Sequence, residues 1–435
     1  MNEITQCAEI GDERVPMHDV FSTGLHQRYM YTQSECSSGL STISSLSRYS
    51  LPYKLMHTQH LELGDVKQAL SVCACFVVTG LGAGLPLVYG LLEDNLELLF
   101  GFRERPPWDW QRSRTSILIG AMQFASYFAV CRMAVWAQCR MGVRVMVALG
   151  ALATAAMQSK FWQLCLAYML VGAGTSVSAH AAGRPRVGAA GVGAAAMGVL
   201  WQHLAVYTSP GRALRWTALA CAGTQVLMVP FLFAPVWPAS IEARPSDCGN
   251  AQAPSALRLS VDWRQAASLF GLLLHSMMYL LPFVFLPGYV TTQLPVTHHL
   301  SAALPVSVIG LGMAVGGCSA QPLRTWSGVQ PSVVRCGARL GLSLAVWCLW
   351  LPAGSSWGMV CGFSAVYGLC LGVTGDACVR NTWANVAVVA GVAVGVPVGS
   401  WLFVGVGSGV YYMPLVTFTA AGLLLTAVCD AVSSA

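Results

Sequence analysis

The sequence predicts an all-α membrane protein in which twelve transmembrane helices form two six-helix bundles. Of its 435 residues, 55% are hydrophobic and only 10% are charged, and the mean hydropathy is +0.59. A helix needs about 20 mostly apolar residues to cross roughly 30 Å of hydrocarbon. Stretches suited to such helices recur along the chain at 68–91, 115–137, 144–159, 162–182, 187–207, 214–235, 266–288, 300–320, 334–352, 357–376, 383–405 and 411–430.

The polar segments divide the chain into four regions. Residues 1–66 are polar and serine-rich, which predicts a disordered cytosolic tail. Residues 67–236 hold the first six spans, and residues 266–435 hold the other six. Between them, residues 237–265 are rich in proline, serine and charge and predict a cytosolic linker. We therefore expect two bundles joined by a polar connection.

The distribution of charge predicts the orientation. Most of the 24 lysines and arginines fall in the tail, the linker and the loops that face the cytosol if the amino terminus is cytosolic. Because positive residues concentrate on the cytosolic side, we expect both termini in the cytosol. We expect an integral multi-pass protein of the lipid bilayer, located in the plasma membrane. We expect no nucleic-acid partner, and no pattern predicts a protein partner.

Cysteine use indicates packing rather than chemistry. Most of the 16 cysteines lie within apolar spans, where thiols behave as small hydrophobic groups. The sequence therefore predicts no metal site and no cofactor.

Small residues recur at a spacing of four in three spans. In the fifth span, which follows Arg184 and Arg186, Gly191 pairs with Ala195 and Ala194 with Gly198. Similar series are Gly312 with Gly316 in the eighth span, and Gly391, Gly395 and Gly399 with Pro397 in the eleventh. This spacing allows two membrane helices to touch backbone to backbone.

Short motifs recur between the halves and follow a familiar order. The fourth and tenth spans share a tyrosine followed by glycines and a threonine, in Tyr168–Thr175 and Tyr367–Thr374. Other motifs are Gly80 to Gly84 with Tyr89-Gly90, Ile119-Gly120-Ala-Met-Gln123, Arg184-Pro-Arg186 with Ala189-Ala-Gly191, and Gly395-Val-Pro397-Val-Gly399. This series resembles the major facilitator superfamily and, within it, the fungal type of the monocarboxylate-transporter group.

The chain also departs from that family. The loop motif Cys139–Arg144 lacks the acidic residue usual in the superfamily. Leu87 follows Gly84-Leu85-Pro86 where the proton-coupled animal members carry a lysine, and the segment 305–316 lacks their aspartate and arginine. These departures leave the means of coupling open.

The resemblance implies secondary transport by alternating access, with two halves that rock around a central solute site. It implies that helices two and eleven, and five and eight, meet between the halves. On this interpretation the glycine series of the fifth, eighth and eleventh spans, including Gly191, Gly198, Gly312, Gly316, Gly391, Gly395, Pro397 and Gly399, serve the interface and its gating. Tight packing without motion is the alternative interpretation.

Ionisable residues inside a bilayer are costly and usually functional. Arg132 is the only charged residue that we expect well inside a span, where it either binds a solute carboxylate or extends to the interface. His275 and His203 either carry a proton or simply pack. No aspartate or glutamate lies near the middle of a predicted span, so we expect transport that is facilitative or coupled through these histidines.

Amphipathic side chains are candidates for the cavity wall. They are Gln123, Tyr89, Tyr279, Tyr168 and Tyr367. Such groups suit a small organic solute with polar edges, and a monocarboxylate is one option. An efflux carrier for a secondary metabolite and a transporter-like sensor that binds without flux are the alternatives. We expect no enzymatic activity, and the chain contains no GxxxxGK[ST] motif for an ATP-driven pump.

Overall fold

The computed structural model describes residues 51–91, 120–130, 141–155, 169–177, 186–232, 262–294, 302–327, 330–354, 356–375, 382–402 and 412–434. The chain divides into two compact units, Met1–Val66 and Lys67–Ala435. Apart from the start of the first helix, all the described helices lie in the second unit, and the rest of the predicted tail, 1–50, lies outside the described residues.

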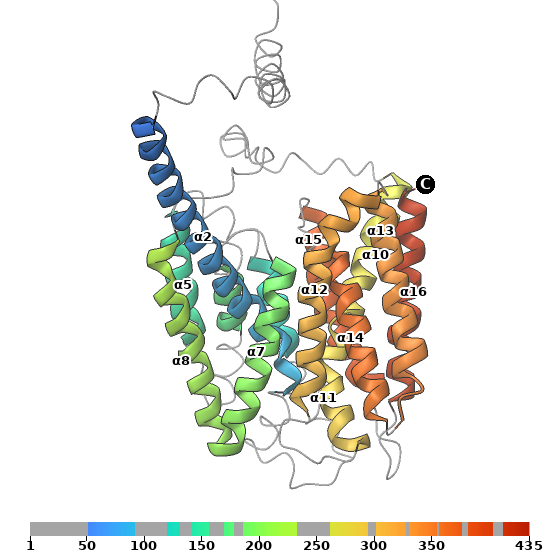
Figure 1. Ribbon diagram of the computed structural model, residues 1–435. Helices are drawn as coiled ribbons and strands as arrows, with labels where there is room; N and C mark the ends of the chain where they lie inside the picture. The colour runs from blue at the N-terminus through green and yellow to red at the C-terminus, as the bar shows by residue number, and fades with distance from the viewer. Residues whose placement is uncertain are drawn as a thin grey trace, which may run out of the picture. The chain divides into compact units, whose positions relative to one another are not determined.

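Helices α2 to η2 correspond to the first six predicted spans (Figure 1). They are α2 (Leu51–Leu87), the helical residues 120–130, α5 (Val143–Ala155), the helical residues 169–177, α7 (Arg186–Tyr207), and α8 (Pro210–Met228) with its 3₁₀ extension η2 (Val229–Phe231). The first helix begins at Leu51, ahead of the predicted start of the first span.

Helices α10 to α16 correspond to the other six spans. They are α10 (Trp263–Met278) with α11 (Leu281–Gln293), α12 (Ala303–Ser327), α13 (Pro331–Ala345) with the π-helical η3 (Val346–Trp350), α14 (Trp357–Thr374), α15 (Thr382–Leu402) and α16 (Met413–Ser434). Within the described residues, 8 helices are long and apolar enough to cross a membrane by themselves, including all six of this half. Every predicted span thus contains helix.

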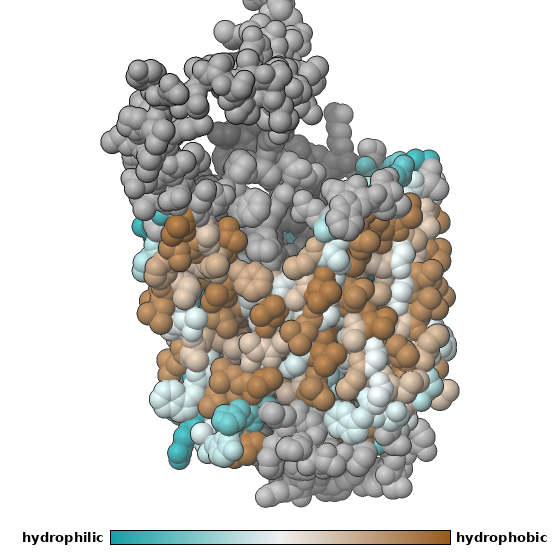
Figure 2. Space-filling view, viewed as in Figure 1, coloured by the Kyte–Doolittle hydropathy of each residue, from teal (hydrophilic) through white to brown (hydrophobic). Residues whose placement is uncertain are grey.

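The outward surface of the helices is apolar. In the view of Figure 2, hydrophobic residues cover the sides of the helices and hydrophilic ones gather at their ends. Large apolar side chains such as Leu152, Val315 and Trp401 remain 71%, 59% and 60% exposed. In water such a surface would drive aggregation, whereas against lipid it is stable.

Glycines let the helices approach within each half. A Cβ on Gly84 of α2 would lie 2.9 Å from the Gly193 Cα of α7, and one on Gly193 would collide with the Gly80 carbonyl. The corresponding contact in the second half joins α15 to α10, where a Cβ on Gly395 would lie 2.5 Å from the Met277 Cα. The first and fifth helices of each half therefore pack in the same way.

The second and fourth helices of each half also pack alike. A Cβ on Gly172 would collide with the Gln123 carbonyl of residues 120–130, and one on Gly372 of α14 would lie 2.7 Å from the Gly317 nitrogen of α12. Both glycines belong to the repeated tyrosine-glycine motif, Gly172 four residues after Tyr168 and Gly372 five residues after Tyr367. The repeat seen in the sequence is thus a repeat of helix packing.

Candidate functional site

The first helix of each half is interrupted. α2 ends at Leu87, directly after Pro86, and helix resumes at Tyr89. The seventh span stops at Met278 and resumes as α11, with Pro282 in its first turn. Proline lacks the N–H that would continue the helical hydrogen bonds, so the helix breaks or bends beside it. The two breaks occupy corresponding positions in the repeat.

The two broken segments touch each other. A Cβ on Gly90 would collide with the carbonyl oxygens of Phe283 and Val284 in α11. No other residue type allows this approach without moving one of the backbones. Gly90 therefore joins the two halves directly beyond the breaks.

Aromatic side chains surround the breaks. The ring of Tyr89 is fully buried and lies against Gly120. At the second break, the Tyr279 ring stacks on His275 at 5.6 Å between centroids and meets the edge of Phe128 at 6.5 Å. Residues 120–130 thus reach from one break to the other.

A tyrosine hydroxyl satisfies the backbone at the second break. The Tyr367 hydroxyl of α14 donates to the Tyr279 carbonyl over 3.1 Å. An unpaired carbonyl inside the bilayer would be costly, so this bond stabilises the interruption. Four of the residues predicted for the solute site, Tyr89, Tyr279, His275 and Tyr367, therefore lie at or beside the breaks.

Gln123 lies on the same helix, between Gly120 and Phe128. Its side chain is fully buried, and neither its amide nitrogen nor its amide oxygen has a hydrogen-bond partner among the described residues. Buried polar groups without partners are rare in proteins and call for an explanation. This helix therefore carries a buried amide with an unused donor and an unused acceptor.

The other predicted site residues lie elsewhere. His203 is exposed on α7, and its ring lies against Tyr207, at 4.7 Å between centroids. His203 thus lies on a side of α7 that the other described helices leave exposed. Arg132 and Tyr168 lie outside the described residues.

α7 and α12 pack side by side at the contact between the halves (Figure 1). A Cβ on Gly191 would lie 3.0 Å from the Ala314 nitrogen and would collide with the Gly310 carbonyl. Further along, the Ser307 hydroxyl donates to the Ala195 carbonyl over 3.2 Å and lies 3.3 Å from a Cβ built on Gly198. The Gly191–Ala195 face therefore meets the other half backbone to backbone.

The remaining glycine series lie within the second half. Gly312 and Gly316 face α14, where a Cβ on Gly312 would lie 2.9 Å from the Leu369 nitrogen. Gly310 and Gly317 of the same helix face α7 instead. Gly310 and Gly317 are seven residues apart and so lie on one side of the helix, whereas Gly312, two residues from Gly310, lies on another side. We expected Gly312 and Gly316 to lie between the halves, but they contact α14 of their own half.

The eleventh-span series also faces its own half. Gly391 and Gly395 lie against α10, and a Cβ on Gly399 would lie 2.7 Å from a Leu281 methyl group of α11. Pro397 lies within α15 between these contacts. We expected these glycines to meet the second helix. Instead, the space beside each of them is occupied by residues of the seventh span, α10 and α11.

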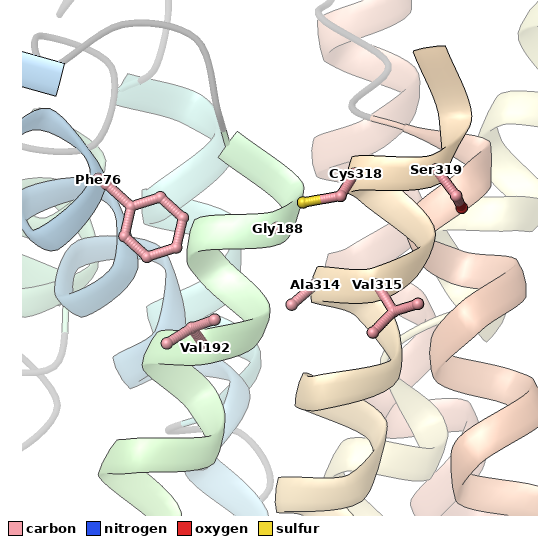
Figure 3. A pocket seen from close by; sticks show the side chains of 7 residues that line it. All are labelled: Phe76, Gly188, Val192, Ala314, Val315, Cys318 and Ser319. Carbon is pink, nitrogen blue, oxygen red and sulfur yellow. The ribbon is translucent and has the colours of Figure 1, made fainter. Parts of the chain in front are cut away.

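An open groove runs beside the α7–α12 contact. It encloses about 520 Å³ and is lined by Phe76, Gly188, Val192, Ala314, Val315, Cys318 and Ser319. The Cys318 sulfur points toward Gly188 across the groove (Figure 3). The lining is almost wholly apolar, which suits hydrocarbon rather than a polar solute.

One charged pair was not anticipated from the sequence. Arg339 of α13 and Asp430 of α16 form an ion pair of 2.5 Å, with side chains only 7% and 16% exposed. From the sequence we expect Arg132 to be the only charged residue well inside a span. The available signals were an arginine within an apolar helix and a lone acidic residue in the last one.

Solved structures share this arrangement of helices. The chain matches a D-xylose–proton symporter with a TM-score of 0.59 and 11% identity, over 83% of this chain and 96% of that one. It matches the inward-open xylose transporter XylE from E. coli with a TM-score of 0.57 and 9% identity, over 81% and 94%. The chain adopts the major facilitator fold.

The chain also matches the crystal structure of tetrameric PepTSo2, with a TM-score of 0.51 and 12% identity, over 84% of this chain and 96% of that one. No family model and no curated protein matches the chain in sequence. The likeness therefore concerns the fold of the superfamily and does not extend to the monocarboxylate-transporter group.

Proposed function

We propose that this protein is a secondary transporter that moves a small organic solute across the membrane by alternating access. The observation that carries the proposal is the pair of broken helices that meet at Gly90. In secondary transporters, interrupted helices at corresponding positions of two repeats mark the solute site, because the break exposes backbone groups inside the bilayer. Two observations support this: aromatic side chains lie at the breaks, and Gln123, whose buried amide has no partner among the described residues, lies on the helix that contacts both Tyr89 and Tyr279.

The chemistry beside the breaks suggests an uncharged or weakly charged solute. Hydroxyl, amide and imidazole groups provide polar contacts, and aromatic rings provide apolar ones. The described residues beside the breaks carry no permanent charge. A monocarboxylate would need a cation, for which Arg132 is the candidate.

The α7–α12 contact is the proposed moving surface. Gly191, Gly198 and their partners let two backbones slide closely, whereas Gly312, Gly316, Gly391, Gly395 and Gly399 hold the second bundle together. Each bundle would then rock as a body about the solute site, with Pro397 inside the rigid part.

The test is counterflow into liposomes that contain the purified full chain. A panel of neutral sugars, aromatic alcohols and short monocarboxylates is screened for saturable exchange. Gln123→Ala should abolish exchange. The control is Gln330→Ala, which replaces an exposed glutamine at the residue just before α13 and should not change exchange. Arg132→Ala should abolish exchange only if the solute is a carboxylate.

Two outcomes would contradict the proposal. One is that Gln123→Ala leaves the exchange unchanged, which would mean that the solute site does not lie at the breaks. The other is saturable binding with no exchange for any solute, which would favour the transporter-like sensor. Exchange that runs outward in cells, with accumulation after deletion, would support the efflux carrier of a secondary metabolite.

A further inference from the structure

The apolar groove beside the α7–α12 contact is lined by both halves of the protein. Phe76 of α2 and Val192 of α7 belong to the first half, and Ala314 and Val315 of α12 belong to the second (Figure 3). The side chains of Val192 and Val315 remain 36% and 59% exposed. The groove therefore opens on the apolar outer surface of the helices, where lipid is the surrounding medium.

The lining suits a hydrocarbon chain. The volume of about 520 Å³ lies within the range of roughly 300–1,000 Å³ that small-molecule sites occupy. The hydroxyl that Ser319 contributes to the lining already donates to the Gly316 carbonyl over 3.0 Å, so it requires no hydrogen bond from an occupant. The part of an occupant that enters this groove is therefore apolar.

An apolar lining by itself does not select one lipid over another. An acyl chain is surrounded by apolar groups in bulk lipid as it is in the groove, so its transfer gives little hydrophobic free energy. A preference for one lipid must come from its head group. The residues at the end of the groove then decide which head group binds.

Each of the three helices that line the groove carries one lysine or arginine from residue 67 onward. Lys67 precedes the spanning part of α2 by two residues, Arg186 is the first residue of α7, and Arg324 lies three residues before the end of α12. The same parts of these helices contain no aspartate and no glutamate. All the formal charge that these helices bring to the groove is therefore positive.

The helix directions place these bases at one end of the groove. α7 and α12 are antiparallel, since a Cβ on Gly317 would lie 3.1 Å from the Gly188 nitrogen while one on Gly310 would collide with the Gly191 carbonyl. The start of α7 thus lies beside the end of α12. Arg324 follows Gly317 by seven residues, which places it on the side of α12 that faces α7.

α2 runs in the same direction as α7. Gly80 lies against Ala189, and Gly84 lies against Ala194 further along both helices. Lys67, before the spanning part of α2, therefore belongs to the same end as the start of α7. The charge distribution predicts that this end is cytosolic, and the cytosolic leaflet is the one that holds anionic lipids.

We propose that the groove is a binding site for an anionic phospholipid. One acyl chain of the lipid lies along the apolar lining between α7 and α12, and its phosphate is bound by Arg186 and Arg324 at the end of the groove. Basic residues between membrane helices on the cytosolic side are typical of sites for anionic head groups. No covalent bond forms or breaks.

The position of the site gives the lipid a role in conformational change. The lining belongs to both halves, so the width of the groove changes when the halves move apart or together. A ligand shifts a conformational equilibrium toward the state that it binds more tightly. This consequence rests on the proposed transport function, whereas the binding site itself does not.

The test is photolabelling of the purified full chain in phosphatidylcholine vesicles. The probe is a phosphatidylglycerol that carries a diazirine at the end of one acyl chain, and peptide mass spectrometry locates the label after irradiation. The α7 and α12 residues of the groove should be labelled. Labelling should exceed that by a phosphatidylcholine probe with the same chain by about thirtyfold, because each of the two arginines contributes about fivefold.

Two pairs of variants test the two parts of the site. Val192→Trp and Val315→Trp fill the groove from its two sides, and each should remove the groove label. Their control is Leu227→Trp on α8, where the native side chain is 68% exposed, and it should keep the label.

Arg186→Gln and Arg324→Gln should keep the label but should each lower the preference for phosphatidylglycerol about fivefold. Their control is Arg212→Gln, which replaces an exposed arginine of α8 and should leave the preference unchanged. Both lipid probes carry the same acyl chain, so the ratio of their labelling is insensitive to changes in the apolar lining.

Three results would overturn the proposal. They are equal labelling by the two probes in the wild type, which would mean that the groove meets surrounding lipid only, a groove label that survives both tryptophan variants, and a preference that neither arginine variant lowers. Labelling requires no solute. A chain that labels as expected but shows no counterflow would lose the proposed transport function and keep the lipid site.

Discussion

Replacing Gly191 with alanine adds one methyl group where α7 crosses α12. The added Cβ would lie 2.9 Å from the Met313 Cβ and 3.0 Å from the Ala314 nitrogen, and would collide with the Gly310 carbonyl. Two of these neighbours are backbone atoms of the other half, so the two helices must move apart. Overpacking of this kind costs about 1–3 kcal/mol.

The control is Gly223→Ala on α8. A Cβ at Gly223 meets nothing within 4 Å, so only the helix preference for alanine, about 1 kcal/mol, should act. That preference acts equally at Gly191. The difference in the free energy of unfolding between the two variants therefore isolates the packing cost, and should be about 1–3 kcal/mol in favour of Gly223→Ala.

Thermal unfolding in detergent measures this difference. A thiol-reactive dye reports unfolding, because buried free thiols such as Cys221 become accessible. Gly223→Ala should unfold at a temperature a few degrees above that of Gly191→Ala. Equal unfolding temperatures for the two variants would refute the close backbone contact between α7 and α12.

Three further results are expected. Gln123→Leu should leave the free energy of unfolding unchanged or raise it by about 1–3 kcal/mol, because two unpartnered amide atoms leave the interior; a clear loss in chemical denaturation would contradict this. Arg339→Leu should cost about 3–5 kcal/mol by leaving Asp430 buried and unpaired, whereas the double variant with Asp430→Leu should recover most of it; an additive double-mutant cycle would argue against the pair. Tyr367→Phe should cost about 1–3 kcal/mol because the Tyr279 carbonyl loses its donor, and an unchanged unfolding temperature would mean that another group satisfies that carbonyl.

For the glycine motifs, the sequence predicts the contact face of a helix but not the helix that it contacts. Gly191 and Ala195 both contact α12, because a spacing of four places both on one side of a helix. The same reasoning does not identify the neighbour that fills the face. For Gly312 and Gly391 the neighbour belongs to the same half, and no local pattern distinguishes that case from a contact between halves.

The candidate site divides in the same way. Amphipathic groups inside apolar spans make Tyr89, Tyr279 and Gln123 candidates from the sequence, and in the structure Tyr89 and Tyr279 lie at the two breaks. The paired breaks could have been anticipated from Pro86 and Pro282, which interrupt the first helix of each half. Arg339 and Asp430 could not have been paired, because their ion pair joins the ninth helix to the last one.

The sequence by itself determined the class of protein, the number and order of its spans, and the repeat of six. These follow from hydropathy, because the thickness of the hydrocarbon sets the length of each apolar run and lipid forces each run into a helix. Only the tertiary structure decided that Gly90 meets α11, that α7 meets α12, and that Asp430 neutralises Arg339. Such contacts join residues far apart in the chain, and they depend on the rotation of each helix about its axis, which hydropathy does not specify.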